Sequence, residues 1–115
     1  MNPIRRKLSS FLIETAHEGI NALDPQSPCA KELSEIADAD AAIAEDSEKI
    51  CQAATLPEIT RILFLAARLR KTSGQKRNRI KSDLKKIAET LITRAEANSG
   101  PLKLPQSCRH VLLGV

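Results

Sequence analysis

Apolar residues recur at helical spacing along most of the chain, and this periodicity restricts the fold more than any other feature. The clearest example runs from Ile80 to Ala95, where apolar side chains return every three or four residues. Such spacing places them on one face of an α-helix, which turns once in about 3.6 residues. Valine, a common strand residue, occurs only at positions 111 and 115. The sequence therefore predicts an all-α fold.

Prolines and polar caps divide the periodic stretches into separate helices. A first helix is expected over residues 2–23 and ends at Asp24, because a residue before proline avoids the helical conformation. Ser27 and Pro28 begin a second helix, which is predicted to continue to about Ala54. Residues 55–58 (Thr-Leu-Pro-Glu) form a capping-box sequence at the start of a third helix.

The number of helices depends on Gly74. This glycine either caps the third helix or is tolerated inside one long helix at a cost of about 1 kcal/mol relative to alanine. We predict a small bundle or hairpin array of three helices, or four if Gly74 ends the third. The helical domain should cover residues 1–100, followed by a proline-containing tail over residues 101–115. The tail is expected either to dock as an extended arm or to fray.

The third helix is apolar around most of its circumference. The chain has two Phe and neither Trp nor Tyr, so its core must be aliphatic. A helix that is apolar on several sides is buried in a core or lies at an interface. This feature predicts a homodimer. The predicted core and interface residues are Ile59, Ile62, Leu63, Phe64, Leu65 and Leu69.

Charge is strongly segregated along the chain. Residues 28–58 carry eight acids and two bases, whereas residues 59–86 carry ten bases and one acid, for formal charges of −6 and +9. Rows of cations along a helix can follow a phosphate backbone and release its counterions. We therefore predict a nucleic-acid-binding segment. Its candidate residues are Arg68, Arg70, Lys71, Lys76, Arg77, Arg79, Lys81, Lys85 and Lys86.

The residue types around this segment indicate how nucleic acid would be bound. Binding of single strands usually requires aromatic side chains on which bases stack, and both Phe residues fall on apolar stripes. Duplex RNA or DNA, held mainly by phosphate contact, is therefore favoured over a single strand. The expected role is regulatory or shielding rather than catalytic.

The charge pattern is also compatible with two alternatives to nucleic-acid binding. The basic segment could pair with the acidic segment, within one chain or across a dimer, or it could be a solvated surface. The protein could also be a helical protein-interaction module, such as an adaptor, chaperone or assembly subunit, with no nucleic-acid ligand. The single Met and the missing Tyr and Trp argue against an interface built around aromatic anchors.

Candidate catalytic and metal-binding residues are few. His17 lacks the nearby lysine expected of a phosphotransfer histidine. Cys108 and His110 supply two ligands where a zinc site needs about four. The acidic segment lacks the glycine of a calcium-binding loop. Without a phosphate-binding or hydrolase motif, we expect no enzyme activity, no metal and no cofactor.

The three cysteines include no closely spaced pair. No apolar run approaches the roughly 20 residues of a membrane-spanning helix, and no signal peptide is recognisable. We therefore expect an intracellular protein, cytoplasmic or nuclear, in a reducing environment and with no membrane partner.

Overall fold

The computed structural model describes residues 2–114, which form five α-helices and one 3₁₀-helix and include no strand. The all-α prediction is confirmed, but the helices are more numerous than the three or four expected. In chain order the elements are α1 (Pro3–Asn21), α2 (Pro28–Leu33), α3 (Ala39–Ala53), α4 (Leu56–Arg70), α5 (Gly74–Ser99) and the 3₁₀-helix η1 (Gln106–Leu112).

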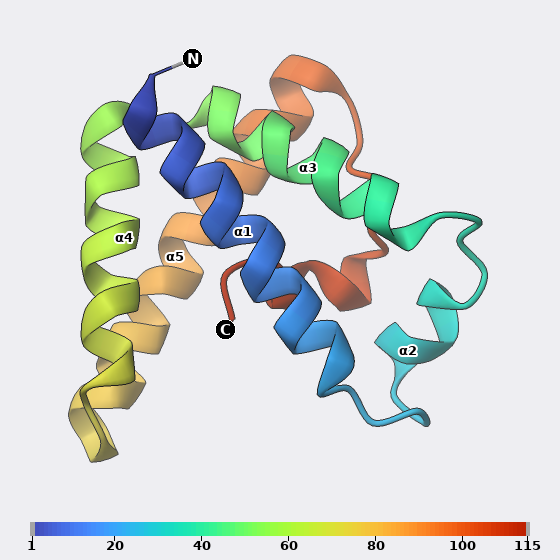
Figure 1. The fold of residues 1–115 in the computed structure, drawn as a ribbon, viewed down its shortest axis with the longest axis horizontal. Helices are drawn as coiled ribbons and strands as arrows, with labels where there is room; N and C mark the ends of the chain where they lie inside the picture. The colour runs from blue at the N-terminus through green and yellow to red at the C-terminus, as the bar shows by residue number, and fades with distance from the viewer. Residues whose placement is uncertain (1, 115) are drawn as a thin grey trace.

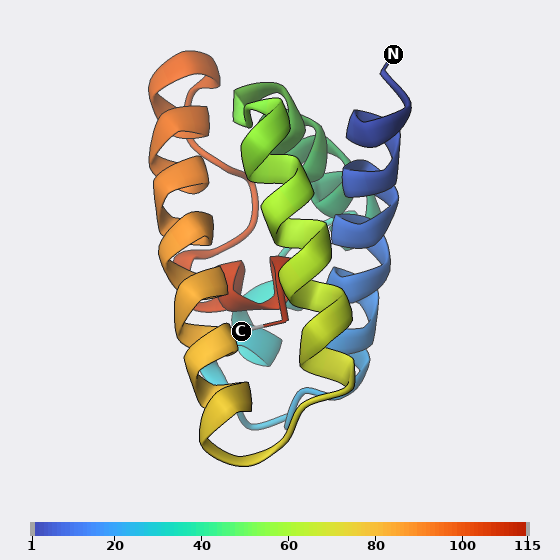
Figure 2. The same ribbon diagram turned by 90° about the vertical axis from the view of Figure 1, so that its left-hand side faces the viewer.

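Helices α4 and α5 form an antiparallel hairpin along one side of the molecule (Figures 1 and 2). Helix α1 packs against α3, α4 and η1, and α3 also packs against α5. The short helix α2 lies at the far side from the hairpin, against η1 (Figure 1). The aliphatic core lies between these helices, so that the hairpin is covered on one side and open on the other.

The predicted second helix is wrong as a single element, because the chain leaves the helical conformation between Leu33 and Ala39. Ser34 closes α2 by donating its hydroxyl proton to the Lys31 carbonyl oxygen at 2.6 Å. Asp38 then caps α3, and its carboxylate accepts the Ala41 N–H at 3.0 Å. Each cap satisfies a backbone group that a helix end would leave without a partner, so the break is stabilised locally.

Gly74 does break the predicted third helix. Helix α4 ends at Arg70, and Gly74 begins α5 with a φ of +69°, a conformation that costs glycine little. The turn is closed by Arg77, whose guanidinium donates to the Leu69 carbonyl oxygen. Of the two arrangements that the sequence left open, the structure has the hairpin.

The helix starts follow the caps that the sequence indicates. Asn2 and Ser27 accept hydrogen bonds from backbone N–H groups in the first turns of α1 and α2. The capping box of α4 is complete, because the Thr55 hydroxyl accepts the Glu58 N–H while the Glu58 carboxylate accepts the Thr55 N–H at 2.8 Å. These contacts are local, which explains why the sequence predicts them well.

The segment after Pro101 is part of the core rather than an extended arm. Leu104, Cys108 and Leu112 are at most 1% exposed, and Figure 2 shows the segment entering between the helices. It forms the 3₁₀-helix η1, which packs against α1 closely enough that a Cβ on Gly19 would lie 3.1 Å from that of Val111. Val115, the last residue of the predicted tail, lies outside the described residues.

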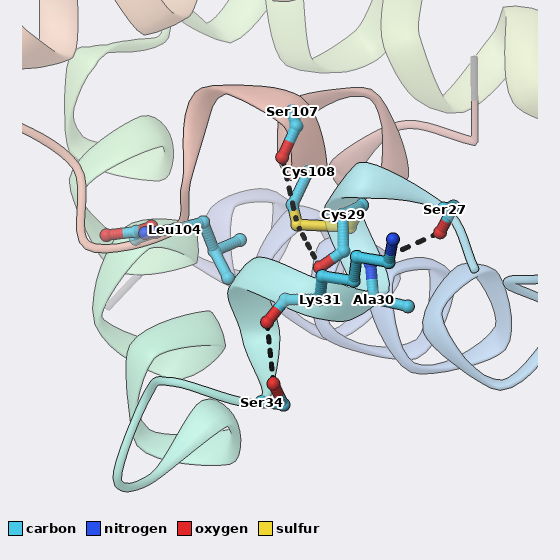
Figure 3. The surroundings of a disulfide bond; sticks show 9 residues. Ser27, Cys29, Ala30, Lys31, Ser34, Leu104, Ser107 and Cys108 are labelled. Atoms are coloured by element: carbon cyan, nitrogen blue, oxygen red, sulfur yellow. Dashed lines mark hydrogen bonds between the residues drawn. A yellow bond between two sulfur atoms is a disulfide. The ribbon is translucent and has the colours of Figure 1, made fainter. Parts of the chain in front are cut away.

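Two of the three cysteines form a disulfide. Cys29 of α2 and Cys108 of η1 are bonded, with their Cα atoms 4.9 Å apart, although 79 positions separate them in the sequence (Figure 3). Cys51 is free and buried, and burial raises the pKa of its thiol to about 11. The spacing of the cysteines in the sequence therefore does not predict this disulfide, because the fold brings together two residues that are far apart in the chain.

Candidate functional site

The hairpin arranges part of the basic segment as two rows. Arg61 and Arg68 lie seven residues apart on α4, and Arg79 and Lys86 lie seven residues apart on α5. Seven residues are about two helical turns, so the members of each row share one face of their helix. All four side chains are exposed.

The two rows lie on the same side of the hairpin. Glu58 of α4 meets Arg94 of α5 at 2.7 Å, which identifies the flank at which the helices face each other. At about 100° per residue, each row lies roughly 60–80° around its helix from that contact, away from the core. When each helix is viewed along its axis from the N-terminus, both rows are rotated from the contact in the same direction. Because the two helices are antiparallel, equal rotations in that direction bring both rows to the same side of the hairpin. We call this surface the outer basic face; it consists of Arg61, Arg68, Arg79 and Lys86.

None of the ten basic residues between Arg61 and Lys86 forms an ion pair within residues 2–114. Of the nine predicted binding residues, seven are exposed, and only Arg77 and Lys81 are half-buried. The one acid within the segment, Asp83, is half-buried as well. The positive charge of the hairpin therefore faces solvent without carboxylate partners in the described chain.

The acidic residues are engaged elsewhere. Asp46 is buried, and its carboxylate accepts the backbone N–H groups of Lys103 and Leu104 at 2.8 and 2.7 Å. Glu45 lies 3.0 Å from the Lys103 ammonium, and Asp40 lies 3.7 Å from the His17 ring. Pairing of the basic segment with the acidic one, which the sequence left open, does not occur within the described part of the chain.

The predicted binding residues do not all lie on the outer basic face. Arg77 has a structural contact across the turn, and Lys85 lies on the opposite flank of α5, where it lines a hollow of about 320 Å³ between α5 and η1. Arg61 belongs to the face although the predicted set omits it. Its seven-residue spacing from Arg68 was the available signal, but the hairpin was needed to bring α5 alongside.

The hollow between α5 and η1 is a weaker candidate site. Its most prominent polar groups are Arg109 and Glu96, which already bind each other through two hydrogen bonds of 3.0 Å. Glu89 offsets the charge of Lys85 on the same wall. In residues 2–114, no group of three or more His, Cys, Asp and Glu side chains is placed to hold a metal ion.

The predicted interface residues separate into three groups by burial. Ile59, Ile62 and Leu65 are at most 6% exposed and belong to the core of the chain itself, so they are not available to a partner. Leu63 and Leu69 pack partly against that core. Phe64, in contrast, is 58% exposed, so it is the one residue of the predicted interface set whose side chain is largely open to a partner.

Comparison of the chain with models of protein families, with curated proteins and with solved structures finds no match. Within the described residues, no helix has the length and hydropathy that crossing a lipid bilayer requires.

Proposed function

We propose that the outer basic face of the α4–α5 hairpin binds the phosphates of a nucleic-acid duplex. The observation that carries this proposal is the lack of any ion pair to the basic side chains from Arg61 to Lys86 in the described chain. Cations that are exposed and unneutralised are the groups that a polyanion can contact with the release of its counterions.

The dimensions of the face support a duplex ligand. Two helical turns separate the members of each row by about 10 Å, and packed helices lie about 8–10 Å apart. Four cations spaced on this scale are comparable in extent to a duplex groove, which is about 12 Å wide for the major groove of B-DNA. Contacts of this kind hold the backbone without reading sequence, so the proposed role is regulatory or shielding rather than catalytic.

Substitution of the face with neutral residues tests the proposal. In a variant with Arg61, Arg68, Arg79 and Lys86 changed to Gln, the slope of log affinity against log salt should fall by up to about 4, near 0.9 for each lost phosphate contact. The measurement is duplex binding by fluorescence anisotropy at several salt concentrations, with the label on the nucleic acid.

A control variant removes the same charge elsewhere. Arg6, Lys7, Lys31 and Lys103 are exposed and lie outside the hairpin, so their change to Gln lowers the net charge equally. This control should keep most of the wild-type salt slope. If both variants lose the same affinity and slope, binding follows net charge alone, and the outer basic face is not the site.

A second candidate function is a helical protein-interaction module that acts through α4, with a homodimer as one form. Leu56 and Phe64 lie eight residues apart on this helix and are 42% and 58% exposed, so they offer apolar surface to a partner. A pull-down with and without nuclease separates the two functions, because a protein partner would be retained after the nucleic acid is digested. Light scattering that gives 12.6 kDa at high concentration would exclude the homodimer.

An intracellular location, cytoplasmic or nuclear, is part of the proposal, since a duplex ligand is abundant there. The disulfide of Cys29 and Cys108 is the feature that opposes it, because reducing compartments keep most thiols free. Subcellular fractionation tests the location, and recovery of the protein only from an oxidising compartment or from the medium would exclude it.

A further inference from the structure

Phe64 is an unusual side chain for the surface of this protein. At 58%, it is the most exposed large apolar residue between positions 2 and 114, and the other Phe, Phe11, packs partly against the core. A single exposed apolar side chain is common on protein surfaces, so the neighbours of Phe64 decide what it could bind. The phosphate contacts alone do not account for the exposure of Phe64.

The position of Phe64 connects it to the outer basic face. It follows Arg61 by three residues and precedes Arg68 by four, so it is the direct neighbour of both on α4. The Arg68 guanidinium carbon lies 5.7 Å from the centre of the Phe64 ring, within the range of a cation–π contact. The ring thus lies at the edge of the face, between two cations.

We propose that Phe64 stacks on an unpaired base at the end or at a bulge of the bound duplex. This inference rests on the proposed function and names the class of duplex preferred: one with a junction between paired and unpaired nucleotides. Arg61 and Arg68 would hold the phosphates on either side of the junction, and the ring would receive the base that has no pairing partner.

The chemistry of the site suits this ligand. An aromatic ring stacks on any base, because every base has a π-face, so the preference is for an unpaired nucleotide and not for a sequence. Because one aromatic side chain lies at the edge of the outer basic face, we expect one base to stack on it.

A second copy of the chain is a poorer occupant of the same surface. In a two-fold dimer the same patch meets itself, which would bring the Arg61 and Arg68 pairs of both copies together around the two Phe64 rings. Like charges placed opposite each other at an interface oppose association. A polyanion, in contrast, is attracted electrostatically by each of these cations.

Two duplexes and two variants test the inference. The ligands are a blunt duplex and the same duplex with one unpaired nucleotide at an end. Wild-type protein should bind the second about 5- to 10-fold more tightly, toward the low end of what stacking of one base on an aromatic ring contributes. Phe64→Ala should bind both with the wild-type affinity for the blunt duplex, whereas Ile4→Ala, at an exposed apolar position of α1, should keep the preference.

The outcomes separate this inference from the proposed function. Absence of salt-dependent binding to either duplex would overturn both. Binding without a preference for the unpaired nucleotide, or a preference that Phe64→Ala retains, would overturn the stacking inference and leave the duplex site in place.

A fluorescence experiment detects the stack directly. The chain has no Trp, so Phe64→Trp introduces the only one, and Ile4→Trp provides a control with the single Trp at an exposed position of α1, outside the hairpin. Fluorescence of the Phe64→Trp variant should be quenched by the duplex with the unpaired nucleotide and little by the blunt one. Equal quenching in both variants would contradict the inference, as would light scattering in which Phe64→Ala converts a dimer to a monomer.

Discussion

Asp46 is an acidic residue that lies buried in the core of the described chain. Its carboxylate is fully buried and accepts two backbone N–H groups, those of Lys103 and Leu104, more than 50 residues away in the sequence. A buried polar group stabilises the fold only when its partners are present, and here each side of the contact satisfies the other. Asp46 thereby fixes the segment that leads into η1.

Substitution of Asp46 should be strongly destabilising. Asp46→Ala would leave two N–H groups without acceptors, one of them fully buried, and we expect the free energy of unfolding to fall by about 2–4 kcal/mol. The matched control is Glu45→Ala, which removes an exposed carboxylate beside it and should cost less than about 1 kcal/mol. Urea denaturation measures both, and equal losses would show that Asp46 does not anchor the segment.

The sequence carries little information about such a residue. It places Asp46 within an acidic helical stretch, where a carboxylate that is exposed to solvent or paired with the basic segment is the reasonable expectation. The backbone groups that need its carboxylate belong to residues 103 and 104, and no local pattern connects them to position 46. Phe64 presents the opposite case, because it belongs to one predicted core and interface set of six residues, and the apolar pattern does not indicate which of the six remains exposed.

At the scale of elements, the α4–α5 hairpin is held at both ends. Near the turn, Arg77 binds the Leu69 carbonyl oxygen, and at the open end Arg94 binds the Glu58 carboxylate through contacts of 2.7 and 3.2 Å. The Arg94 hydrogen bond lowers the pKa of Glu58 to about 2. The ion pair thus keeps the two helices in the register that aligns the rows of the outer basic face.

The lowered pKa of Glu58 predicts how stability changes with acid. Its pKa is below the value near 4.5 that applies without these contacts, so the stabilisation is fully present above pH 4.5 and is lost as the pH falls toward 2. Glu58→Gln keeps a side chain able to complete the capping box but removes the charge. It should cost about 1 kcal/mol at pH 7, a discounted value because 26% of the Glu58 side chain remains exposed.

Thermal or urea unfolding between pH 2 and 7 measures this effect. The stability difference between wild-type protein and Glu58→Gln should shrink as the pH falls through that range. A difference that stays constant across the range would show that the charge of Glu58 is not the cause.

The elements themselves were predictable to the extent that their causes are local. Capping residues such as Thr55 and Ser27 act within one turn, and the structure has helices beginning where they indicate. The break at Ser34 was missed because its apolar neighbours keep a helical spacing on both sides. The basic segment is contiguous and therefore visible in the sequence, whereas the shared side of Arg61 and Arg79 depends on how α4 and α5 pack.

At the scale of the whole molecule, the contacts that complete the core join distant parts of the chain. The disulfide of Cys29 and Cys108 connects α2 to η1, and both sulfur-bearing residues are at most 2% exposed (Figure 3). The radius of gyration, 13.7 Å, is close to the roughly 13 Å expected of a folded domain of this length. The C-terminal segment is therefore packed within the domain and is not a separate tail.

Reduction of the disulfide should lower stability markedly. Closing a loop of 79 residues restricts the unfolded chain, and the expected loss on reduction is up to about 4 kcal/mol at 25 °C. The measurement is urea unfolding with and without dithiothreitol. A Cys29→Ser/Cys108→Ser variant is the control, since its stability should not depend on the reductant. Detection of three reactive thiols instead of one in the denatured, unreduced protein would contradict the pairing.

Because a ribosome makes the chain from its N-terminus onward, the packing of the segment after Pro101 also affects how the protein folds during translation. Leu104, Leu112 and their neighbours fill space that α1 and α3 cannot close without them. Helices that have already emerged during translation must therefore remain with apolar surface uncovered until residues 102–113 have also left the exit tunnel. Chaperones that bind nascent polypeptides could bind α1 and α3 during that interval.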